Sequence, residues 1–343
     1  MTLRPALDRH LPAVDSLLRD ILAAPSERFK CLYGMMQYHH GWLDEQLRPV
    51  QADAGKRLRP ALCLLSCEAC GGDADTALPL AAAVELIHSF SLVHDDIQDN
   101  SPLRRHRPTV WALWGAAQAI NVGDILFAAA YGALLRLRGK VPSDLIVSLA
   151  EALQSTCVRI CEGQYLDMGF ETATDVSWED YFSMIERKTG VLVSFATWSG
   201  ATVAGADAER ADLLGAFGRE LGIGFQIQDD VLGIWGQEEE TGKSGSSDIA
   251  SAKKTLPFLH ALRSLPWDQA QELAGLYAAT ERDENAVRRA RALIEASGAR
   301  EHCQDLATQW YERALQSLRA AAPEPGPGQA LEELVEMLAA RRS

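Results

Sequence analysis

Apolar residues recur along most of the chain at intervals of three and four, which is the period of an α-helix that buries one face. One instance is the series Leu145, Leu149 and Leu153. No proline lies between Pro142 and Pro257, so several helices fit into this stretch without interruption. Alternation of polar and apolar residues, the sign of a strand, is scarce throughout. The pattern predicts an all-α protein built from many helices.

Glycine and proline indicate where these helices end. Pro60 suits the first turn of a helix, and Gly71–Gly72 ends that helix after about three turns. A Pro/Gly-rich breaker over 323–328 precedes a short predicted helix over 330–342. The chain has no internal repeat of fixed period and no clear domain boundary, so we expect a single all-α domain over 1–343.

Composition narrows the classes of partner. The 343 residues are 47% hydrophobic and carry a formal net charge of −14, which argues against a nucleic-acid-binding protein. No run approaches the roughly 18 apolar residues of a membrane-spanning helix. The N-terminal stretch MTLRPALDRH lacks the features of a signal peptide. We therefore expect a cytoplasmic protein without a transmembrane segment.

The cysteines do not form an evident metal site. There are seven, an odd number without a paired framework, so reduced thiols are expected. Cys63, Cys67 and Cys70 share one face of the helix that follows Pro60, and no second Cys or His pair accompanies them. Buried thiols are the expected interpretation.

The segment 76–100 combines two stripes on one predicted helix. An apolar stripe and a polar stripe each repeat at three and four residues: Leu86, Phe90, Val93 and Ile97, and His88, Ser91, Asp95 and Asp99. The segment 81–86 is apolar on nearly every side, which predicts a buried helix. Carboxylates on a buried helix require compensation, by metal ions or by cationic partners.

The strongest chemical signal is the cluster of Asp95, Asp96 and Asp99. Asp95 and Asp99 are one turn apart on the same helical face, where carboxylates repel each other unless a cation lies between them. Mg²⁺ suits this pattern, because proteins typically hold it with one or two carboxylates while phosphate and water complete its shell. Basic residues occur on both sides of the cluster in this acidic chain, at 55–60 and at Arg104–Arg105. Acidic and basic groups together indicate two diphosphates, one bound through metal and one bound directly.

A second acidic site follows far along the chain, in the segment 224–230. Gln226 precedes Asp229 and Asp230 by three and four residues, on the same helical face. Basic residues accompany this site too: Lys188 before it, and Lys243, Lys253 and Lys254 in the glycine-bearing stretch after it. We expect the two acidic sites to face each other across the core of a helical bundle.

Five segments in series resemble the motifs of trans-isoprenyl diphosphate synthases, most of all the short-chain geranylgeranyl and farnesyl diphosphate synthases. They are GKRLRP, IHSFSLVHDDIQDNSPLRRHRPT, KTG, GFQIQDD and GKSGSSDI, between about residue 50 and about residue 260. The resemblance implies a bundle of the isoprenoid synthase type with its active site in a central cavity, and a homodimer. It also implies a prenyltransferase that condenses isopentenyl diphosphate head-to-tail with an allylic diphosphate, by a Mg²⁺-dependent carbocation mechanism.

The resemblance also implies residue roles. Isopentenyl diphosphate would be bound by Lys56, Arg59, His88 and Arg105. The allylic diphosphate and its chain would be bound by Arg104, Lys188, Thr189, Gln226, Lys243 and Lys253. Two Mg²⁺ ions would be held by Asp95, Asp96 and Asp99, and a third by Asp229 together with Asp230. The residues expected to carry catalysis are Asp95, Asp96, Asp99, Arg104, Lys188, Gln226 and Asp229.

Three positions depart from the family pattern. Gly233 stands where the second motif usually has its third aspartate, so the third Mg²⁺ is expected to have one protein ligand fewer and more water. His106 and Ala252 replace glycines that are common in the family, and we expect an altered backbone at His106. Because of the change at Ala252, Lys253 is chosen over Lys254 as the site lysine.

The residues before the first motif bear on product length. The resemblance implies that a bulky residue at this point limits chain growth, and here the aromatic Phe90 adjoins the small Ser91. This pairing resembles geranylgeranyl synthases, so we expect a product of twenty carbons, with the fifteen-carbon farnesyl diphosphate as the alternative.

Three other functions remain as alternatives. A di-iron bundle would use Glu85 and His88 but needs a second Glu-x-x-His, which the chain lacks. A class I terpene cyclase shares the first aspartate motif but would want a Glu where Gln237 stands. A non-catalytic subunit of a prenyl synthase would have no use for the intact first motif and both basic clusters.

Overall fold

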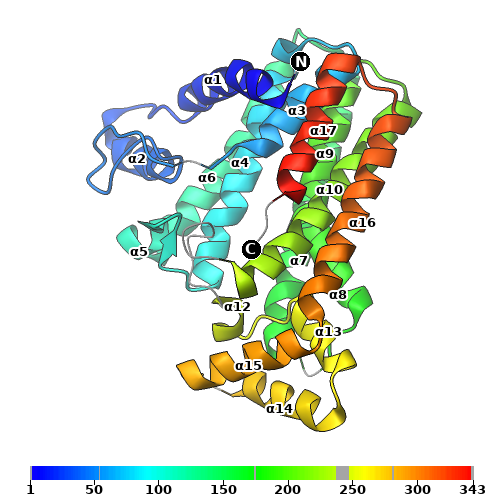
Figure 1. Cartoon of the computed structure of the whole chain (residues 1–343). Helices are drawn as coiled ribbons and strands as arrows, with labels where there is room; N and C mark the ends of the chain where they lie inside the picture. The colour runs from blue at the N-terminus through cyan, green and yellow to red at the C-terminus, as the bar shows by residue number, and fades with distance from the viewer. Residues whose placement is uncertain (1, 54, 174, 237–246, 280–281, 341–343) are drawn as a thin grey trace. The chain divides into compact units, whose positions relative to one another are not determined.

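Helices make up almost all of the regular structure (Figure 1). The computed structural model describes residues 2–53, 55–173, 175–236, 247–279 and 282–340. Within these ranges the one sheet is a hairpin of two short antiparallel strands, β1 (Leu103–Arg104) and β2 (Arg107–Pro108). The expected all-α class is confirmed.

The chain folds into two compact units, each made of several segments. Unit 1 comprises 1–158, 192–218 and 317–333, and unit 2 comprises 159–191, 219–316 and 334–343. The single domain expected from the sequence stays a prediction.

Unit 1 contains the N-terminal helices and the hairpin. Its complete helices are α1 (Leu3–Ile21), η1 (Glu27–Phe29), α2 (Lys30–His39), α3 (Leu58–Ala69), α4 (Ala74–Gln98), α5 (Val110–Trp114), α6 (Ala116–Leu134) and η2 (Leu135–Leu137). It also contains parts of α7 (Ser143–Thr172), α9 (Val191–Val203), α10 (Ala208–Trp235), α16 (Ala299–Ala320) and α17 (Pro325–Ala339).

Unit 2 contains the other parts of α7, α9, α10, α16 and α17. Its complete elements are α8 (Trp178–Ile185), the π-helix η3 (Glu186–Gly190), α12 (Ser247–Ala250), α13 (Leu256–Ser264), α14 (Trp267–Ala278) and α15 (Glu284–Ala296). The Ser177 side chain begins α8 with a capping box, in which its hydroxyl accepts the backbone N–H of Asp180.

Helix α4 forms the core of unit 1, where it packs against α3 and α6. Asp73 caps its start by accepting the backbone N–H of Asp75. Every residue from Leu80 to Ile87 is buried, as the apolar segment predicts. The buried half of α4 therefore fixes the position of the polar residues that follow at its C-terminal end.

The C-terminal helix differs from its prediction. Helix α17 begins at Pro325, inside the segment that the sequence indicates as a breaker, and ends at Ala339. Proline is tolerated in the first turn of a helix because the N–H groups there have no partner within the helix. Pro325 and Pro327 both lie in that turn, so here they begin the helix instead of preventing it.

Two helices are long and apolar enough to cross a membrane by length and composition alone, namely α4 and the stretch Ala116–Leu137. The sequence interpretation expected no such segment. The apolar window of α4 is mostly buried inside the protein, as in the core helix of a globular fold. The window in Ala116–Leu137 is less buried, and it leaves apolar side chains such as Ile120 at the surface.

The cysteines are all free thiols. Cys63 and Cys67 are buried and Cys70 is half-buried, in accord with the expected thiols along one helix face. Among the described residues, no group of three or more His, Cys, Asp or Glu side chains is placed so that it could hold a metal ion.

Candidate active site

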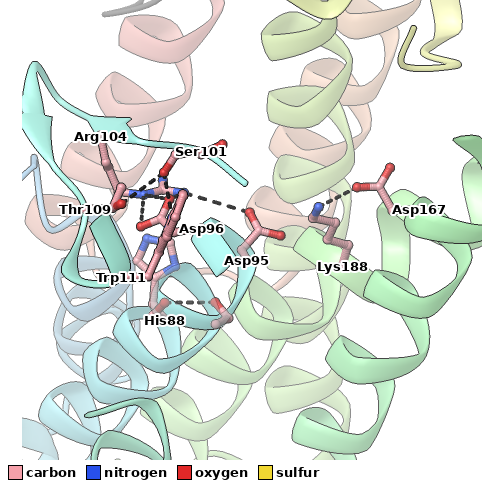
Figure 2. A network of polar contacts seen from close by, with 10 residues as sticks. His88, Asp95, Asp96, Ser101, Arg104, Thr109, Trp111, Asp167 and Lys188 are labelled. Atoms are coloured by element: carbon pink, nitrogen blue, oxygen red, sulfur yellow. Dashed lines mark hydrogen bonds and ion pairs between the residues drawn. The ribbon is translucent and has the colours of Figure 1, made fainter. Parts of the chain in front are cut away.

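The first aspartate motif lies at the C-terminal end of α4 in unit 1 (Figure 2). The Asp96 side chain is buried, and both of its oxygens accept from Arg104. Arg104 Nε lies 2.9 and 3.1 Å from Oδ1 and Oδ2 of Asp96, and its Nη2 lies 2.8 Å from Oδ1. The same Nη2 is 3.9 Å from Oδ2 of Asp95. Asp95 and Asp99 are each partly exposed.

The hairpin that carries Arg104 is joined to α4 by further hydrogen bonds. Thr109 Oγ1 and Trp111 Nε1 both donate to the carbonyl oxygen of Ser101, at 3.0 and 2.9 Å (Figure 2). The Ser101 N–H in turn donates to the Asp96 carbonyl at 2.9 Å. The sequence did not point to Ser101, Thr109 and Trp111. Their hydrogen bonds form only because the β1–β2 hairpin brings residues after the turn back to residues before it.

The turn of this hairpin consists of Arg105 and His106, which both have positive φ, 52° and 60°. Positive φ at both central residues is the requirement of the type I′ turn, which favours glycine or asparagine. His106 adopts the left-handed conformation that a glycine would adopt there at lower cost. The altered backbone expected at this position stays a prediction.

The basic loop before α3 meets this turn within unit 1. Gly55 has a φ of +80°, and a Cβ on it would overlap the guanidinium of Arg105. The close approach therefore requires glycine at position 55. It brings the GKRLRP segment and the Arg104–Arg105 pair together, as the sequence predicted for a shared anion site. Lys56 is exposed beside them.

Arg57 holds the shape of this loop. It has a φ of 44°, and its side chain is buried. Its Nη2 donates to Asp15 at 3.1 Å, and its Nη1 lies 3.5 Å from Oε1 of Glu85. Burial raises the pKa of Glu85, although the nearby Arg57 charge opposes this. Asp15 and Glu85 were not among the predicted site residues, and only their contacts with Arg57 reveal them.

His88 accepts a hydrogen bond from Arg59. The two side chains approach at 3.2 Å between Nε2 and Nη1. Arginine only donates, so His88 Nε2 accepts and the ring proton lies on Nδ1. Removal from water, together with the charges of Arg59 and Arg105, holds the pKa of His88 well below its usual range. The imidazole is therefore neutral, and the positive charge of the site resides on arginines.

Aromatic side chains extend along α4 and α6. The Phe90 ring lies 5.3 Å from that of Phe127, which is 5.5 Å from that of Tyr131. Ser91 donates to the carbonyl oxygen of His88 at 2.8 Å. The rings of Phe90, Phe127 and Tyr131 are all partly exposed. Phe127 and Tyr131 were missed in the sequence, although their four-residue spacing on one helix face is a usable signal.

The predicted lysine of unit 2 lies on the π-helix η3. Lys188 Nζ lies 2.5 Å from Oδ2 of Asp167 on α7 (Figure 2). Gly163 permits this approach, because a Cβ there would overlap the backbone of Lys188. Asp167 was also missed, and the signal that points to it is Gly163, a glycine inside a helical pattern one turn earlier.

The second acidic motif forms a hydrogen-bonded chain on α10. Thr189 Oγ1 donates to Gln226 Oε1 at 2.8 Å, and Gln226 Nε2 donates to Asp230 Oδ1 at 3.0 Å. Asp230 Oδ2 accepts from the Tyr181 hydroxyl at 2.6 Å and from the Leu256 N–H at 3.3 Å. Asp230 is 5% exposed, and burial raises its pKa to about 7. Asp230 thus has three protein donors, whereas Asp229 is partly exposed.

The two lysines after this motif have different surroundings. Lys254 donates to the carbonyl oxygens of Phe170 at 2.8 Å and Glu171 at 3.2 Å, at the end of α7. Lys253 is partly exposed, and its N–H donates to the Asp248 carbonyl at 2.9 Å. Ala252 before them has a φ of 54°, the backbone that a glycine would favour. Lys243 and Gln237 lie outside the described residues.

The donor set of unit 1 suits a hard divalent cation. Mg²⁺ takes oxygen ligands and commonly uses only one or two carboxylates together with substrate phosphates and water. Asp95 and Asp99 supply two carboxylates one turn apart, while Arg104 neutralises Asp96 between them. The neighbouring arginines supply charge for a phosphate that no metal contacts.

Comparison with known proteins supports this interpretation. The model of the polyprenyl synthetase family matches residues 40–294. The (2E,6E)-farnesyl diphosphate synthase of Mycobacterium tuberculosis is 44% identical over 223 residues, which are 65% of this chain and 61% of that protein. The match thus spans less than two thirds of that relative. The geranylgeranyl diphosphate synthase of the same organism is 39% identical over 292 residues, 85% of this chain and 82% of that protein.

Solved structures resemble the chain over nearly its whole length. A polyprenyl synthetase from Streptomyces coelicolor is 35% identical with a TM-score of 0.88, covering 98% of this chain and 99% of that one. A polyprenyl synthase from Caulobacter crescentus, complexed with calcium and isoprenyl diphosphate, is 31% identical with a TM-score of 0.85, covering 99% and 97%.

Proposed function

This chain belongs to the polyprenyl synthetase family, and from that premise we propose that it is a short-chain trans-prenyltransferase that condenses isopentenyl diphosphate head-to-tail with an allylic diphosphate. One observation carries the proposal. Within unit 1, two partly exposed carboxylates, Asp95 and Asp99, adjoin the arginine cluster that holds a neutral His88. This combination supplies both means of binding a diphosphate, through a divalent cation and directly.

Different residues are assigned to each of the two substrates. Lys56, Arg59, His88 and Arg105 are proposed to bind isopentenyl diphosphate. His88 positions Arg59 by accepting its hydrogen bond. Because the imidazole is neutral, His88 adds no charge of its own. Arg104 binds Asp96 and also lies 3.9 Å from Asp95, which places its guanidinium beside the proposed site of the allylic diphosphate. In unit 2, the residues assigned to the allylic substrate are Lys188, Thr189, Gln226 and Lys253, with Lys243 outside the described residues.

Condensation begins when the allylic C–O bond breaks and its electron pair leaves with pyrophosphate. Bound Mg²⁺ ions supply the charge that makes pyrophosphate a good leaving group. Arg104 and Lys188 add fixed positive charge, and removing one preorganised contact of this kind costs about 10²–10³ in rate. The isopentenyl double bond then supplies the two electrons of the new C–C bond, and loss of a proton to the released pyrophosphate gives the extended allylic diphosphate. No side-chain nucleophile is required.

Three Mg²⁺ ions are proposed, two near Asp95 and Asp99 and one near Asp229. In each motif the adjacent aspartate has protein donors of its own. Arg104 binds Asp96, and Tyr181 and Gln226 bind Asp230. These donors favour Asp95, Asp99 and Asp229 as the direct ligands, and the metal contacts predicted for Asp96 and Asp230 stay predictions.

The product is proposed to be geranylgeranyl diphosphate, with farnesyl diphosphate as the alternative. Phe90 contacts Phe127, so the bulk near the first motif comes from two helices of unit 1. Relatives at comparable identity carry both names, geranylgeranyl and farnesyl diphosphate synthase. The choice of the twenty-carbon product over the fifteen-carbon product depends on Phe90 beside the small Ser91.

A homodimer is the proposed assembly. Unit 1 exposes apolar side chains on α6, η2 and its part of α7: Ile120, Leu135, Val147 and Val158. A second copy of the chain is the proposed cover for these side chains. We also propose that the protein is cytoplasmic and that the chain functions as a single domain.

The first experiment is an assay with Mg²⁺ and isopentenyl diphosphate. The purified chain receives dimethylallyl, geranyl or farnesyl diphosphate in turn, and mass spectrometry gives the size of the products. A series ending at twenty carbons is expected, and an end at fifteen would support the alternative product. Consumption of an allylic diphosphate without isopentenyl diphosphate would indicate a terpene cyclase. Consumption of neither would indicate a non-catalytic subunit.

A further inference from the structure

Arg57 lies between two residues that are assigned to isopentenyl diphosphate. Lys56 precedes it, and Arg59 lies two residues after it in the first turn of α3. The backbone of Arg57 has a φ of 44°, a left-handed conformation that is strained in a residue with a Cβ. Such strained residues persist only where the surrounding structure holds them, and they cluster at functional sites. The contacts of the Arg57 side chain show what holds it.

Two carboxylates from different helices bind Arg57 in the core of unit 1. The side chain is only 5% exposed. Asp15 of α1 accepts from its Nη2 at 3.1 Å, and Oε1 of Glu85 on α4 lies 3.5 Å from its Nη1. Among the charges near Glu85, that of Arg57 acts most strongly to lower its pKa against the effect of burial. Arg57 is therefore compensated within the protein, and we do not assign it to a diphosphate.

Trp42 adds a third contact. Its Nε1 donates to Oδ1 of Asp15 at 3.0 Å, the same oxygen that Arg57 binds. The Arg57 guanidinium also lies over the buried indole, 5.8 Å from the centre of the ring. We call Asp15, Trp42, Arg57 and Glu85 the Arg57 anchor. It joins α1, the segment after α2 and α4 to the loop that begins α3.

Helix α4 connects this anchor to the substrate site. Glu85 and His88 are three residues apart on α4, so they lie on the same face of the helix. Glu85 pairs with Arg57, and His88 accepts from Arg59 at 3.2 Å. One face of α4 thus holds two arginines of the loop. The first contact lies in the core, and the second lies at the proposed site of isopentenyl diphosphate.

We propose that Arg57 is a positioning residue for isopentenyl diphosphate, because its anchor holds the strained loop so that Lys56 and Arg59 reach the diphosphate from fixed positions. The inference rests on the proposed function and deepens it. It assigns a role to an arginine of GKRLRP that does not itself touch the substrate, and it makes Asp15 of the N-terminal helix part of the support of the site.

Loss of the anchor should affect one substrate and not the other. Arg104, which is assigned to the allylic diphosphate, is held by Asp96, a residue outside the anchor. A displacement of about 1 Å in a binding group can cost up to about a hundredfold. A loosened loop should therefore weaken the binding of isopentenyl diphosphate and leave the allylic substrate nearly unaffected.

The test combines binding and kinetics of the full chain. Calorimetry measures the Kd of isopentenyl diphosphate alone, and steady-state assays give kcat and the KM of each substrate. Glu85→Gln keeps the shape of the side chain and removes its charge, and Arg57→Met keeps much of the stem and removes the guanidinium. Each should raise the Kd and KM of isopentenyl diphosphate about tenfold or more, with kcat and the KM of the allylic substrate changed by less than about twofold.

Two further variants identify the contact that is responsible. The double variant of Glu85→Gln with Arg57→Met should lose no more affinity than the weaker of the two single variants, because both changes break the same contact. Arg57→Lys keeps the charge and should recover part of the affinity that Arg57→Met loses. A residue with only a general effect on the fold would show additive losses.

Glu68→Gln is the matched control. Glu68 also joins α1 to α3 through a mostly buried carboxylate, which lies 2.5 Å from Nη2 of Arg9 and 3.0 Å from Nε2 of His10. It lies near the far end of α3, about 16 Å along the helix from Arg57. The variant should unfold at a lower temperature than the parent and keep the KM of both substrates.

The outcomes separate the two proposals. An unchanged KM and Kd of isopentenyl diphosphate in Glu85→Gln and Arg57→Met would overturn the role of Arg57. So would an equal rise in the KM of both substrates, or a rise in Glu68→Gln as large as in Glu85→Gln. If circular dichroism shows that either variant is unfolded, Asp15→Asn replaces it with the same expectation. A parent that neither binds nor consumes isopentenyl diphosphate would overturn the proposed function itself.

Discussion

Arg104 binds both carboxylate oxygens of Asp96, with Nε and Nη2 at 2.8 to 3.1 Å. The pair joins the hairpin to the end of α4, and the Asp96 side chain is almost fully buried. The middle carboxylate of the first motif thus has a partner within the protein, whereas Asp95 and Asp99 on either side are partly exposed. Three aspartates that look alike in the sequence therefore have different roles in the fold.

Replacement of Asp96 by Ala should lower stability. It leaves Arg104, whose side chain is 29% exposed, without its main partner, and leaving such a donor unpaired costs about 1–3 kcal/mol in the free energy of unfolding. Urea unfolding followed by circular dichroism measures the loss. Asp75→Ala, an exposed aspartate in the first turn of α4, is the control and should lose much less. Equal losses in the two variants would contradict the role assigned to Asp96.

Replacement of Asp95 by Ala should abolish turnover and leave helix content nearly unchanged. Its carboxylate is partly exposed, and its proposed contact with Mg²⁺ supports departure of pyrophosphate. We expect kcat to fall by at least about 10²–10³, measured with isopentenyl diphosphate and an allylic starter. Asp75→Ala on the same helix should keep normal activity. Near-normal activity of Asp95→Ala would show that the metal assignment is wrong.

His106→Gly should stabilise the protein. His106 is exposed and has a φ of 60°, where a residue with a Cβ is strained by roughly 1–2 kcal/mol. Part of this gain is offset by the entropy of glycine in the unfolded chain, so the expected net gain is about 1 kcal/mol or less. His106→Ala removes the imidazole but keeps the Cβ, and it should bring no gain. If both variants gained alike, the backbone would not be the cause.

Stability should fall as the pH drops below about 6.5. His40 is 3% exposed, and burial together with the charge of Arg57 holds its pKa well below the usual value. The ring stays neutral in the folded protein and takes up a proton near pH 6.5 when unfolded. Proton uptake then favours the unfolded state as the pH falls, whereas above this range the contribution of His40 is constant.

Urea unfolding at pH values from 7.5 to 5 measures this dependence. His40→Asn should flatten the decline, because the variant has no imidazole to protonate. The comparison is made between slopes and not between absolute stabilities, since the stacking of His40 on Trp42 is lost in the variant. An unchanged slope would show that His40 is not the group that titrates.

Much of the architecture could be predicted from the sequence because helices are local. The three- and four-residue period gave the all-α class, and the wheel of 76–100 placed Asp95 and Asp99 on one face of the helix now seen as α4. The basic residues of 55–60 and Arg104–Arg105 were expected to share a site, and Gly55 and Arg105 do lie together. The breaker at 323–328 was misjudged, because proline is compatible with a first turn and only the start of the helix shows which position it occupies.

The sequence by itself determined the helical class and the identity of the charged residues near each motif, because these follow from short-range periodicity and side-chain chemistry. Only the tertiary structure decided which carboxylates are already paired: Asp96 with Arg104, and Asp230 with Tyr181 and Gln226. It alone placed Arg57 between Asp15 and Glu85. The physical reason is that burial and ion pairing are set by residues far apart along the chain, which a local pattern does not contain.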